Sequence, residues 1–387
     1  MKRNFQLFAT LLFAILISFT ACKDDDDEDE PTPAPPSNEI TGNITQNTTW
    51  TTGNTYTLSA RVSILDGVTL TIEPGVIIKG NAGTGANATA LLVARGGTLI
   101  AEGTDTEPII FTSVADLIEP GEIASPNLDP NLNGLWGGMI VLGYAPISAD
   151  AETQQIEGIP PSDQNGLYGG NQPGDASGSI KYISIRHGGA NIGEGNEING
   201  LTCGGVGTGT TIENVEIVSN QDDGIEWFGG KVDVTNAIVW NTGDDAIDTD
   251  QSWGGTVDNF IIVNPGDECF ELDGPEGTME DRHTIINGTA YAGDAEGLAD
   301  LDDNSIVTME NVYFFGIMPG QDFDLNPTGL TTANLQATIP DTLTLADFFA
   351  AGVNVTEVAE GANTVGADVS AFQNWSWAAV SGALDDF

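Results

Sequence analysis

A short acidic phrase that returns at a fixed spacing constrains the fold of this chain more than any other feature. Residues 222–226 read DDGIE, residues 244–248 read DDAID and residues 267–271 read DECFE. Asp222 to Asp244 is 22 residues and Asp244 to Asp267 is 23, and a looser fourth copy covers 294–302. A period near 22 residues is typical of one coil in a stacked β solenoid, so the phrase predicts how the chain folds.

The rest of the chain agrees with this prediction. From about residue 55, short apolar runs such as 68–72 (VTLTI) and 139–142 (MIVL) alternate with turn residues, which is typical of an all-β chain. Propeller blades need about 40 or more residues, and sandwiches lack a strict short period. Within the repeats, apolar runs lead into asparagine, which tolerates the left-handed backbone of a sharp corner. These expected corner residues are Asn220, Asn241, Asn264 and Asn287.

Charge and the N-terminus narrow the class of protein further. The formal charge is −47, so attraction to nucleic acid or to an anionic membrane is excluded. Lys2 and Arg3 precede an apolar run from Phe5 to Phe19, which is the pattern of a secretion signal and is short for a membrane span. We therefore predict a signal peptide over residues 1–21.

The end of this signal resembles a bacterial lipobox. Residues 19–22 read FTAC, and the resemblance implies cleavage before Cys22 and lipidation of its thiol; a soluble secreted protein is the alternative. Residues 24–30 are all acidic and resemble the export signal of surface lipoproteins of Bacteroidota, although a solvated spacer is the other interpretation. With the proline-rich stretch 31–36, residues 22–38 form a tether. The resemblance implies a lipid anchor in the outer membrane and exposure on the cell surface.

A wider resemblance concerns the body of the chain. Residues 70–79 (LTIEPGVIIK), 134–143 (GLWGGMIVLG) and 222–230 (DDGIEWFGG) are similar to a family of envelope proteins from Bacteroidota. That family is similar to right-handed parallel β-helices of the pectate-lyase-like superfamily, and the resemblance covers roughly residues 40–387. It implies an all-β, right-handed parallel β-helix with about 22 residues per coil, and it implies no activity and no catalytic residues.

Composition along the chain predicts how this β-helix is organised. The coils are expected over 39–319, with long loops at 116–135 and 149–178, where Pro, Gly, Asn and Asp replace strand patterning. Residues 320–387 are expected to form a small C-terminal cap containing a short helix near 345–351, because a solenoid must cover its last open edge. Trp375 and Trp377 are then interpreted as cap core.

Stacking the acidic phrases in register places carboxylates above one another. Two charges about 4.8 Å apart in an effective dielectric of about 20 repel by roughly 3.5 kcal/mol. The nearby bases are few: Lys231, Arg282 and His283. Ca²⁺ takes six to eight oxygen ligands, so it is the predicted cofactor, with a merely solvated acidic face as the alternative. The candidate metal ligands are Asp222, Asp223, Glu226, Asp244, Asp245, Asp248, Asp267, Glu268 and Glu271.

Aromatic residues within the acidic coils suggest a ligand. Side chains alternate along a strand, so some of Trp227, Trp240 and Trp253 are expected to face outward and to form a glycan-binding platform. The alternative is that these rings fill the coil interior or lie under loops. A binding or scaffold module that contacts glycan is the favoured function.

Two further functions remain open. Paired carboxylates in the coils 222–273 could serve a polysaccharide hydrolase or lyase, and residues 241–245 (NTGDD) look like the paired aspartates of pectin-cleaving β-helix hydrolases. However, no Arg-x-Lys step occurs in the chain, and His187 precedes the aspartates at the end of a strand, where a corner residue is expected. The other function is an accessory subunit of an outer-membrane protein complex.

Overall fold

The computed structural model describes residues 38–191 and 198–387 as one compact unit. The predicted signal peptide, Cys22 and the tether up to residue 37 lie outside the described residues. Among the residues that are described, no helix has both the length and the apolar character needed to cross a membrane.

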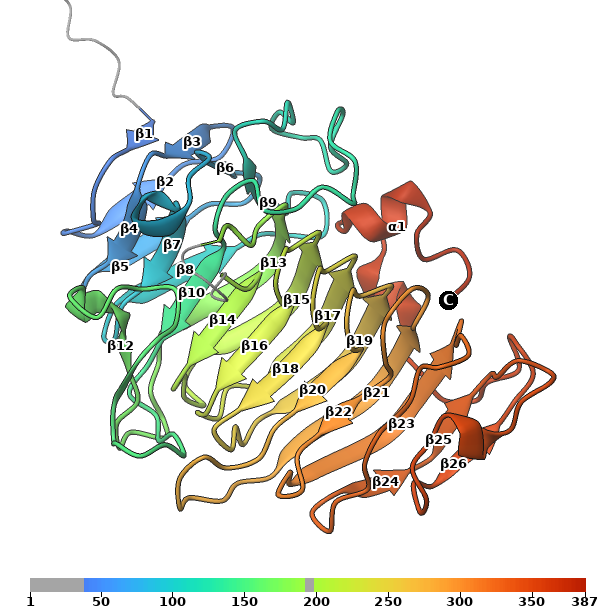
Figure 1. Cartoon of the computed structure of the whole chain (residues 1–387). Helices are drawn as coiled ribbons and strands as arrows, with labels where there is room; N and C mark the ends of the chain where they lie inside the picture. Colours follow the sequence, from blue (N-terminus) through green and yellow to red (C-terminus); the bar gives the residue numbers. More distant parts are fainter. Residues whose placement is uncertain (1–37, 192–197) are drawn as a thin grey trace, which may run out of the picture. The chain divides into compact units, whose positions relative to one another are not determined.

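Two long sheets run side by side through the molecule, and all strand pairings within them are parallel (Figure 1). The first sheet, sheet A, has 16 strands: β1 (Glu39–Ile40), β2 (Thr48–Trp50), β3 (Thr55–Leu58), β5 (Thr69–Ile72), β6 (Ile77–Gly80), β8 (Thr98–Glu102), β9 (Ile109–Ser113), β13 (Gly178–Arg186), β15 (Thr211–Val218), β17 (Val234–Trp240), β19 (Thr256–Val263), β21 (His283–Tyr291), β23 (Val307–Phe315), β24 (Thr331–Ala333), β25 (Leu335–Ala337) and β26 (Val355–Glu357). The second, sheet B, has eight: β4 (Arg61–Ile64), β7 (Ala90–Val93), β10 (Met139–Leu142), β14 (Leu201–Gly204), β16 (Ile225–Phe228), β18 (Ile247–Asp250), β20 (Phe270–Leu272) and β22 (Asp300–Leu301). The predicted all-β fold, a parallel β-helix, is confirmed.

Smaller elements complete the described chain. Strands β11 (Gln154–Gln155) and β12 (Leu167–Tyr168) form an antiparallel pair. The helical elements are the 3₁₀ turns η1 (Gly85–Asn87), η2 (Gln164–Gly166), η3 (Leu345–Asp347) and η4 (Val369–Phe372) and the single α-helix α1 (Trp377–Ser381).

The register of sheet B follows the acidic period. Ile225 pairs with Ile247, and Ile247 pairs with Phe270, so each step along the sheet equals one repeat of the phrase. The inward side chains of successive coils form one continuous apolar core that includes Trp50, Trp227 and Phe349. Burial of this core drives the stacking, because each coil alone cannot hide its apolar face.

The corner residues are partly as predicted. Asn241 and Asn264 have positive φ values of 56° and 55°, and His187 stands at the equivalent corner with φ 59°. One coil before Asn241, the residue with the left-handed backbone is Ser219 and not Asn220. Val218 pairs with Trp240, so Ser219 is the residue equivalent to Asn241.

Asn287 belongs to a different row from the one predicted. It lies inside β21 at the level of Asn259, because the coil between them is longer than the earlier ones. This row forms a hydrogen-bonded ladder in which Asn236 Nδ2 donates to Asn214 Oδ1 (2.9 Å) and Asn259 Nδ2 donates to Asn236 Oδ1 (2.7 Å). Stacked asparagines also bond at the first corner, where Asn264 Nδ2 donates to Asn241 Oδ1 at 3.4 Å.

The C-terminal region differs from the predicted cap. Parallel pairing continues through β25 and β26, so the coils extend beyond residue 319 to Glu357. Residues 359–387 then return along the outer face of sheet A, where Trp375 and Trp377 pack near Trp240, and α1 lies beside the ends of β13–β19 in Figure 1. The two tryptophans are core, as predicted, but they cover the side of the pile and not its end. Residues 345–351 form only the turn η3.

Candidate cation site on sheet B

The outer face of sheet B carries the acidic side chains. Alternation along β16 sends Ile225 and Trp227 inward, where both are fully buried, and leaves Glu226 and Phe228 on the outer face. In the next coils Glu226 lies opposite Asp248, and Asp248 lies opposite Glu271. The predicted carboxylate row is therefore present in the register that the spacing indicated.

Three carboxylates of this face form a tight buried cluster. One oxygen each from Asp223, Glu226 and Asp248 lies within 4.8 Å of the others. These residues are only 7%, 5% and 6% exposed, respectively, which is unusual for acidic side chains. We name this group the buried acidic cluster. It brings together residues from the turn before β16, from β16 and from β18.

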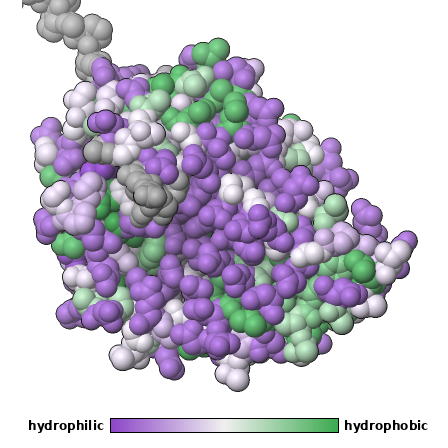
Figure 2. Space-filling model, in the orientation of Figure 1, coloured by the Kyte–Doolittle hydropathy of each residue, from purple (hydrophilic) through white to green (hydrophobic). Residues whose placement is uncertain are grey.

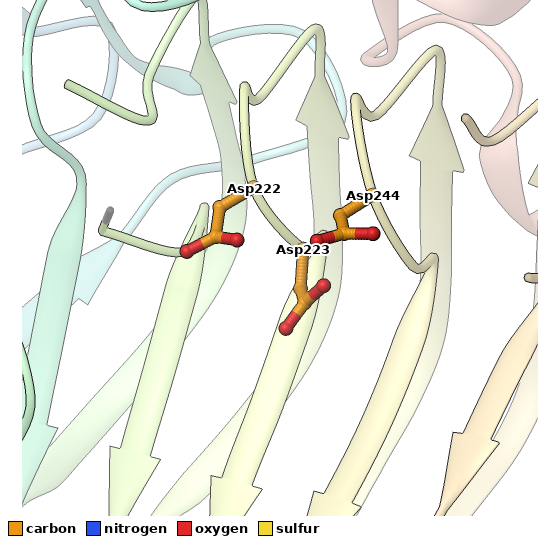
Figure 3. A group of neighbouring side chains, drawn as sticks. All are labelled: Asp222, Asp223 and Asp244. Atoms are coloured by element: carbon orange, nitrogen blue, oxygen red, sulfur yellow. The ribbon is translucent and has the colours of Figure 1, made fainter. Parts of the chain in front are cut away.

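A second group of carboxylates shares Asp223 with the buried acidic cluster. Asp222, Asp223 and Asp244 also place one oxygen each within 4.8 Å of one another. Figure 3 shows Asp222 and Asp223 in one turn and Asp244 in the turn of the next coil. Asp222 and Asp244 are half-buried, so this group is nearer to solvent than the buried acidic cluster.

Asn199 joins the buried acidic cluster and was not predicted. Its side chain is fully buried, and its Nδ2 donates to Glu226 Oε2 and to Thr202 Oγ1. Its Oδ1 is buried and has no hydrogen-bond partner among the described residues. Leu201 pairs with Ile225, so Asn199 stands in the repeat where Asp223 stands one coil later. Residues 199–203 (NGLTC) are thus a neutral copy of DGIEW, and aligning them would have revealed the residue.

Burial and mutual repulsion hold protons on this face. Burial, together with neighbouring carboxylates, raises the pKa of Asp223, Glu226 and Asp248 well above the usual range. Burial and then the hydrogen bond with Glu271 raise the pKa of Asp245 to about 11. Such shifts mean that these carboxyl groups cannot all be ionised together unless a cation balances them.

At the more open end of the acidic face, the pKa values are also raised, but by less. Burial first, and neighbouring carboxylates after it, raise the pKa of Asp273 to about 7. Burial and the adjacent Asp267 raise the pKa of Glu268 to about 8. Asp250 also has a pKa of about 7, chiefly because it is buried.

The basic residues near the repeats are engaged elsewhere. Lys231 pairs with Asp281 at 2.6 Å, and Arg282 donates to the backbone carbonyls of Val307 and Gly329. His283 is buried, and burial lowers its pKa to about 3. None of the ion pairs found in the described ranges reaches the buried acidic cluster.

The loop 149–178 borders the acidic face. It was expected to lack strand patterning, but it contains the hairpin of β11 and β12 and packs Ile156, Ile159 and Tyr168 against the apolar part of the outer face of sheet B. The Tyr168 hydroxyl bonds Gln251 Oε1 at 3.0 Å, which ties the loop to the coil of β18. Hydrophilic surface extends beyond it across β16–β22 (Figure 2).

The remaining predicted metal ligands lie further along the pile. Asp245, Asp267, Glu268 and Glu271 belong to neither group of three converging carboxylates. The Asp245 side chain instead accepts a hydrogen bond from the backbone nitrogen of Glu268 at 2.7 Å. The sites that the structure supports best are therefore confined to Asp222, Asp223, Glu226, Asp244 and Asp248, with Asn199.

The predicted tryptophan platform is wrong. Trp227 and Trp253 point into the coil, where their rings stack at a centroid distance of 4.5 Å. Trp240 does face outward, but Trp377 packs on it edge to face at 5.7 Å, and it is only 7% exposed. The alternation along the strand was read correctly in general, but which rings are inward and which are covered depends on register and on distant segments.

The chain is similar to a described domain family over most of its length. The family of the pectate-lyase-like β-helix domain matches residues 42–379, which include both sheets and the acidic face. No curated protein and no solved structure matches the chain. The parallel coils described above are what this family's description requires. The chain therefore belongs to the family of pectate-lyase-like β-helix domains.

Proposed function

We propose that this protein is a Ca²⁺-binding β-helical module that contacts glycan. The buried acidic cluster carries the proposal, because its three carboxylates converge within 4.8 Å and are almost inaccessible to solvent. At that separation, two ionised groups would repel by about 3.5 kcal/mol in an effective dielectric of about 20. A bound cation removes this repulsion, as protonation of the carboxylates also does.

The donor set favours Ca²⁺ over other metals. Asp223, Glu226 and Asp248 supply carboxylate oxygens, and the unpartnered Oδ1 of buried Asn199 supplies an amide oxygen. Hard oxygen ligands of this kind suit Ca²⁺, which accepts six to eight of them in flexible geometry, and water can complete the shell. The cluster contains neither His nor Cys, the ligands that structural zinc prefers. In this role, the ion neutralises the face and fixes the turns before β16 and β18.

Thermal unfolding of the purified protein in EDTA, in Ca²⁺ and in Mg²⁺ tests the proposal. Ca²⁺ at about 100 times its dissociation constant should add about 2.7 kcal/mol per site, and Mg²⁺ should add less. Glu226→Gln should abolish the Ca²⁺ effect. The exposed Asp303→Asn, which removes the same charge, should keep it. Equal melting temperatures in all three solutions would rule out a specific site.

Glycan binding is proposed for the acidic face beside the loop 149–178. The half-buried and exposed carboxylates of this face, such as Glu271 and Asp300, can accept hydrogen bonds from sugar hydroxyls. Binding to a glycan array, with Ca²⁺ and with EDTA, measures it. If glycan binds in Ca²⁺ and Glu226→Gln abolishes that binding, the result supports a site shared by glycan and Ca²⁺. If no glycan binds in either solution, the result favours the role of an accessory subunit of an outer-membrane complex.

A polysaccharide hydrolase or lyase is the second candidate function. Asp250 and Asp273 lie in consecutive coils, and each has a pKa of about 7, as a general acid at neutral pH requires. Against it, Lys231 and Arg282 are engaged elsewhere. Release of reducing or unsaturated sugar ends, lost in Asp250→Asn, would establish it.

The location follows from the sequence resemblance alone. We propose that Cys22 carries a lipid that anchors the protein in the outer membrane, with the β-helix exposed on the cell surface. Fatty-acid labelling and membrane fractionation test it. Cys22→Ser should lose both the label and the membrane association, and retention of both would contradict the anchor.

A further inference from the structure

Glu157, in the loop 149–178, lies beside the buried acidic cluster. Asn199 Nδ2 donates to Glu157 Oε1 at 3.4 Å and also to Glu226 Oε2. The Asn199 amide therefore joins a carboxylate of the loop to a carboxylate of sheet B, although Glu157 precedes Asn199 by 42 residues. Glu157 is half-buried, so it is nearer to solvent than the cluster itself.

Apolar contacts fix the position of Glu157. Ile156 precedes it directly, Ile159 follows two residues later, and both isoleucines are buried. They pack in the apolar part of the outer face of sheet B, which includes Phe228. Phe228 lies two residues after Glu226 on β16, so both side chains leave the strand on the same side. The packing therefore holds this part of the loop on the face that carries the cluster.

The charge of Glu157 acts on the acidic face. Burial, then Asp248 and Asp223, and then Glu157 raise the pKa of Glu226 well above its usual range. Burial first, and Glu157 among the neighbouring carboxylates, also raises the pKa of Asp250 to about 7. Like charges at this range push the loop away from sheet B unless a cation lies between them.

The ligand set of the buried acidic cluster has room for another carboxylate. The cluster offers converging oxygens from three carboxylates, and the fully buried Asn199 adds an Oδ1 that has no hydrogen-bond partner among the described residues. Ca²⁺ takes six to eight oxygens, and carboxylates bind it through one oxygen or both. Glu157 can therefore accept the Asn199 hydrogen bond with one oxygen and bind the ion with the other.

We propose that Glu157 is a further ligand of the Ca²⁺ ion at the buried acidic cluster, and that the ion thereby fastens the loop 149–178 to sheet B. This inference rests on the proposed Ca²⁺ function and adds its regulation, because the loop borders the face proposed to contact glycan. Without Ca²⁺, repulsion loosens the segment around Glu157, whereas the ion pair of Arg61 with Asp163 at 3.3 Å still holds the tip of the loop.

Hydrogen exchange of the purified full chain in CaCl₂, in MgCl₂ and in EDTA tests the proposal. The Ile156 amide, which donates to the Gly166 carbonyl at 2.9 Å, reports on the order of this segment. In the parent, Ca²⁺ should slow exchange here at least fivefold relative to EDTA, and Mg²⁺ should have less effect.

Two variants of the loop separate a ligand from a nearby charge. Glu157→Gln should lose the slowing of exchange and weaken Ca²⁺ binding at least tenfold in calorimetric titration. In EDTA it should melt at or above the temperature of the parent, because it removes repulsion. Glu152→Gln, which removes an exposed carboxylate of the same loop, should keep both the slowing and the affinity.

The outcomes distinguish this inference from the Ca²⁺ function on which it rests. If Ca²⁺ raises the melting temperature of the parent but leaves exchange in the loop unchanged, the Ca²⁺ site stands and the role of Glu157 is overturned. Equal Ca²⁺ affinity in the parent and in Glu157→Gln overturns that role as well. A lower melting temperature of Glu157→Gln in EDTA would assign the carboxylate to folding instead. If Ca²⁺ does not stabilise the parent, the proposed function fails and this inference fails with it.

Discussion

Replacing Asp248 with asparagine should flatten the pH dependence of stability in the absence of metal. Asp248 is 6% exposed, and its carboxylate lies within 4.8 Å of those of Asp223 and Glu226. Each ionised pair at this distance costs about 3.5 kcal/mol in an effective dielectric of about 20. The substitution removes one charge from two such pairs and keeps the shape of the side chain.

The sign of the pH dependence follows from the direction of the pKa shifts. Burial and neighbouring carboxylates raise the pKa values of Asp223, Glu226 and Asp248 in the folded protein. The unfolded chain releases these protons near pH 4, so above that pH the folded state binds more protons than the unfolded state. The contribution of these three carboxyl groups to the free energy of unfolding is therefore fully present below about pH 4. It is lost as the pH rises through their pKa values in the folded protein.

The size of the effect can be set from Asp250, whose pKa is raised to about 7. A rise in the pKa of Asp250 from 3.8 to about 7 corresponds to on the order of 4 kcal/mol lost between those pH values, since each unit is about 1.4 kcal/mol. The buried acidic cluster adds to this loss. In EDTA, the free energy of unfolding should thus fall by several kcal/mol between pH 5 and pH 8.

Urea unfolding at pH 5, 6, 7 and 8 measures this prediction for the parent, Asp248→Asn and the charge-matched surface control Asp303→Asn. By pH 8 in EDTA, Asp248→Asn should lie roughly 3.5–7 kcal/mol above the parent, between the energy of one and of both removed pairs, and Asp303→Asn should parallel the parent. Saturating Ca²⁺ should flatten the parent curve, because the ion replaces protons. A parent curve that rises with pH in EDTA, or parallel curves for the parent and Asp248→Asn, would refute the reasoning.

Three structural predictions follow from the packing. Trp377→Ala should lower stability by about 3–5 kcal/mol in urea unfolding, because the ring packs on Trp240 and under the Arg186 guanidinium, whose Cζ is 4.9 Å from the ring centroid; a loss under 1 kcal/mol would contradict this. Trp227→Ala should cost a similar amount and leave glycan affinity unchanged in the folded fraction, since the ring is inside the coil. Asn236→Ala should cost about 2 kcal/mol and Asn236→Gly less, because φ is 60° and the side chain links two coils; equal losses would exclude a backbone contribution.

The stacking of the coils could be predicted from the sequence because it depends on spacing alone. A 22-residue step between equivalent residues leaves one parallel register, and Glu226 opposite Asp248 follows from it. The same argument fails where a coil changes length. The coil before Asn287 is longer than its neighbours, so local similarity aligned Asn287 with Asn264, whereas pairing places it beside Asn259.

Burial of the outer face could not be predicted, because it depends on segments far away in the chain. Trp240 faces outward as alternation allows, and residues more than 100 positions later cover it. Likewise, the hairpin of loop 149–178 covers Phe228. Short-range patterns report which side a residue faces, but only tertiary packing decides whether that side meets water.

The acidic phrase was interpreted either as a Ca²⁺ site or as a solvated acidic face. Both interpretations can hold in one molecule, because burial changes along the row of carboxylates on sheet B. Glu226 and Asp248 are buried, Glu271 is half-buried and Asp300 is exposed, although all four are in register. Screening by water removes most of the repulsion at the exposed end, whereas the buried end keeps it. Thr202 ends the row on the buried side, and the nearby Asn199, which corresponds to Asp223 one coil earlier, has a buried oxygen without a hydrogen-bond partner among the described residues. The proposed cation is therefore expected at Asp223, Glu226 and Asp248, whereas the later coils can remain a solvated face.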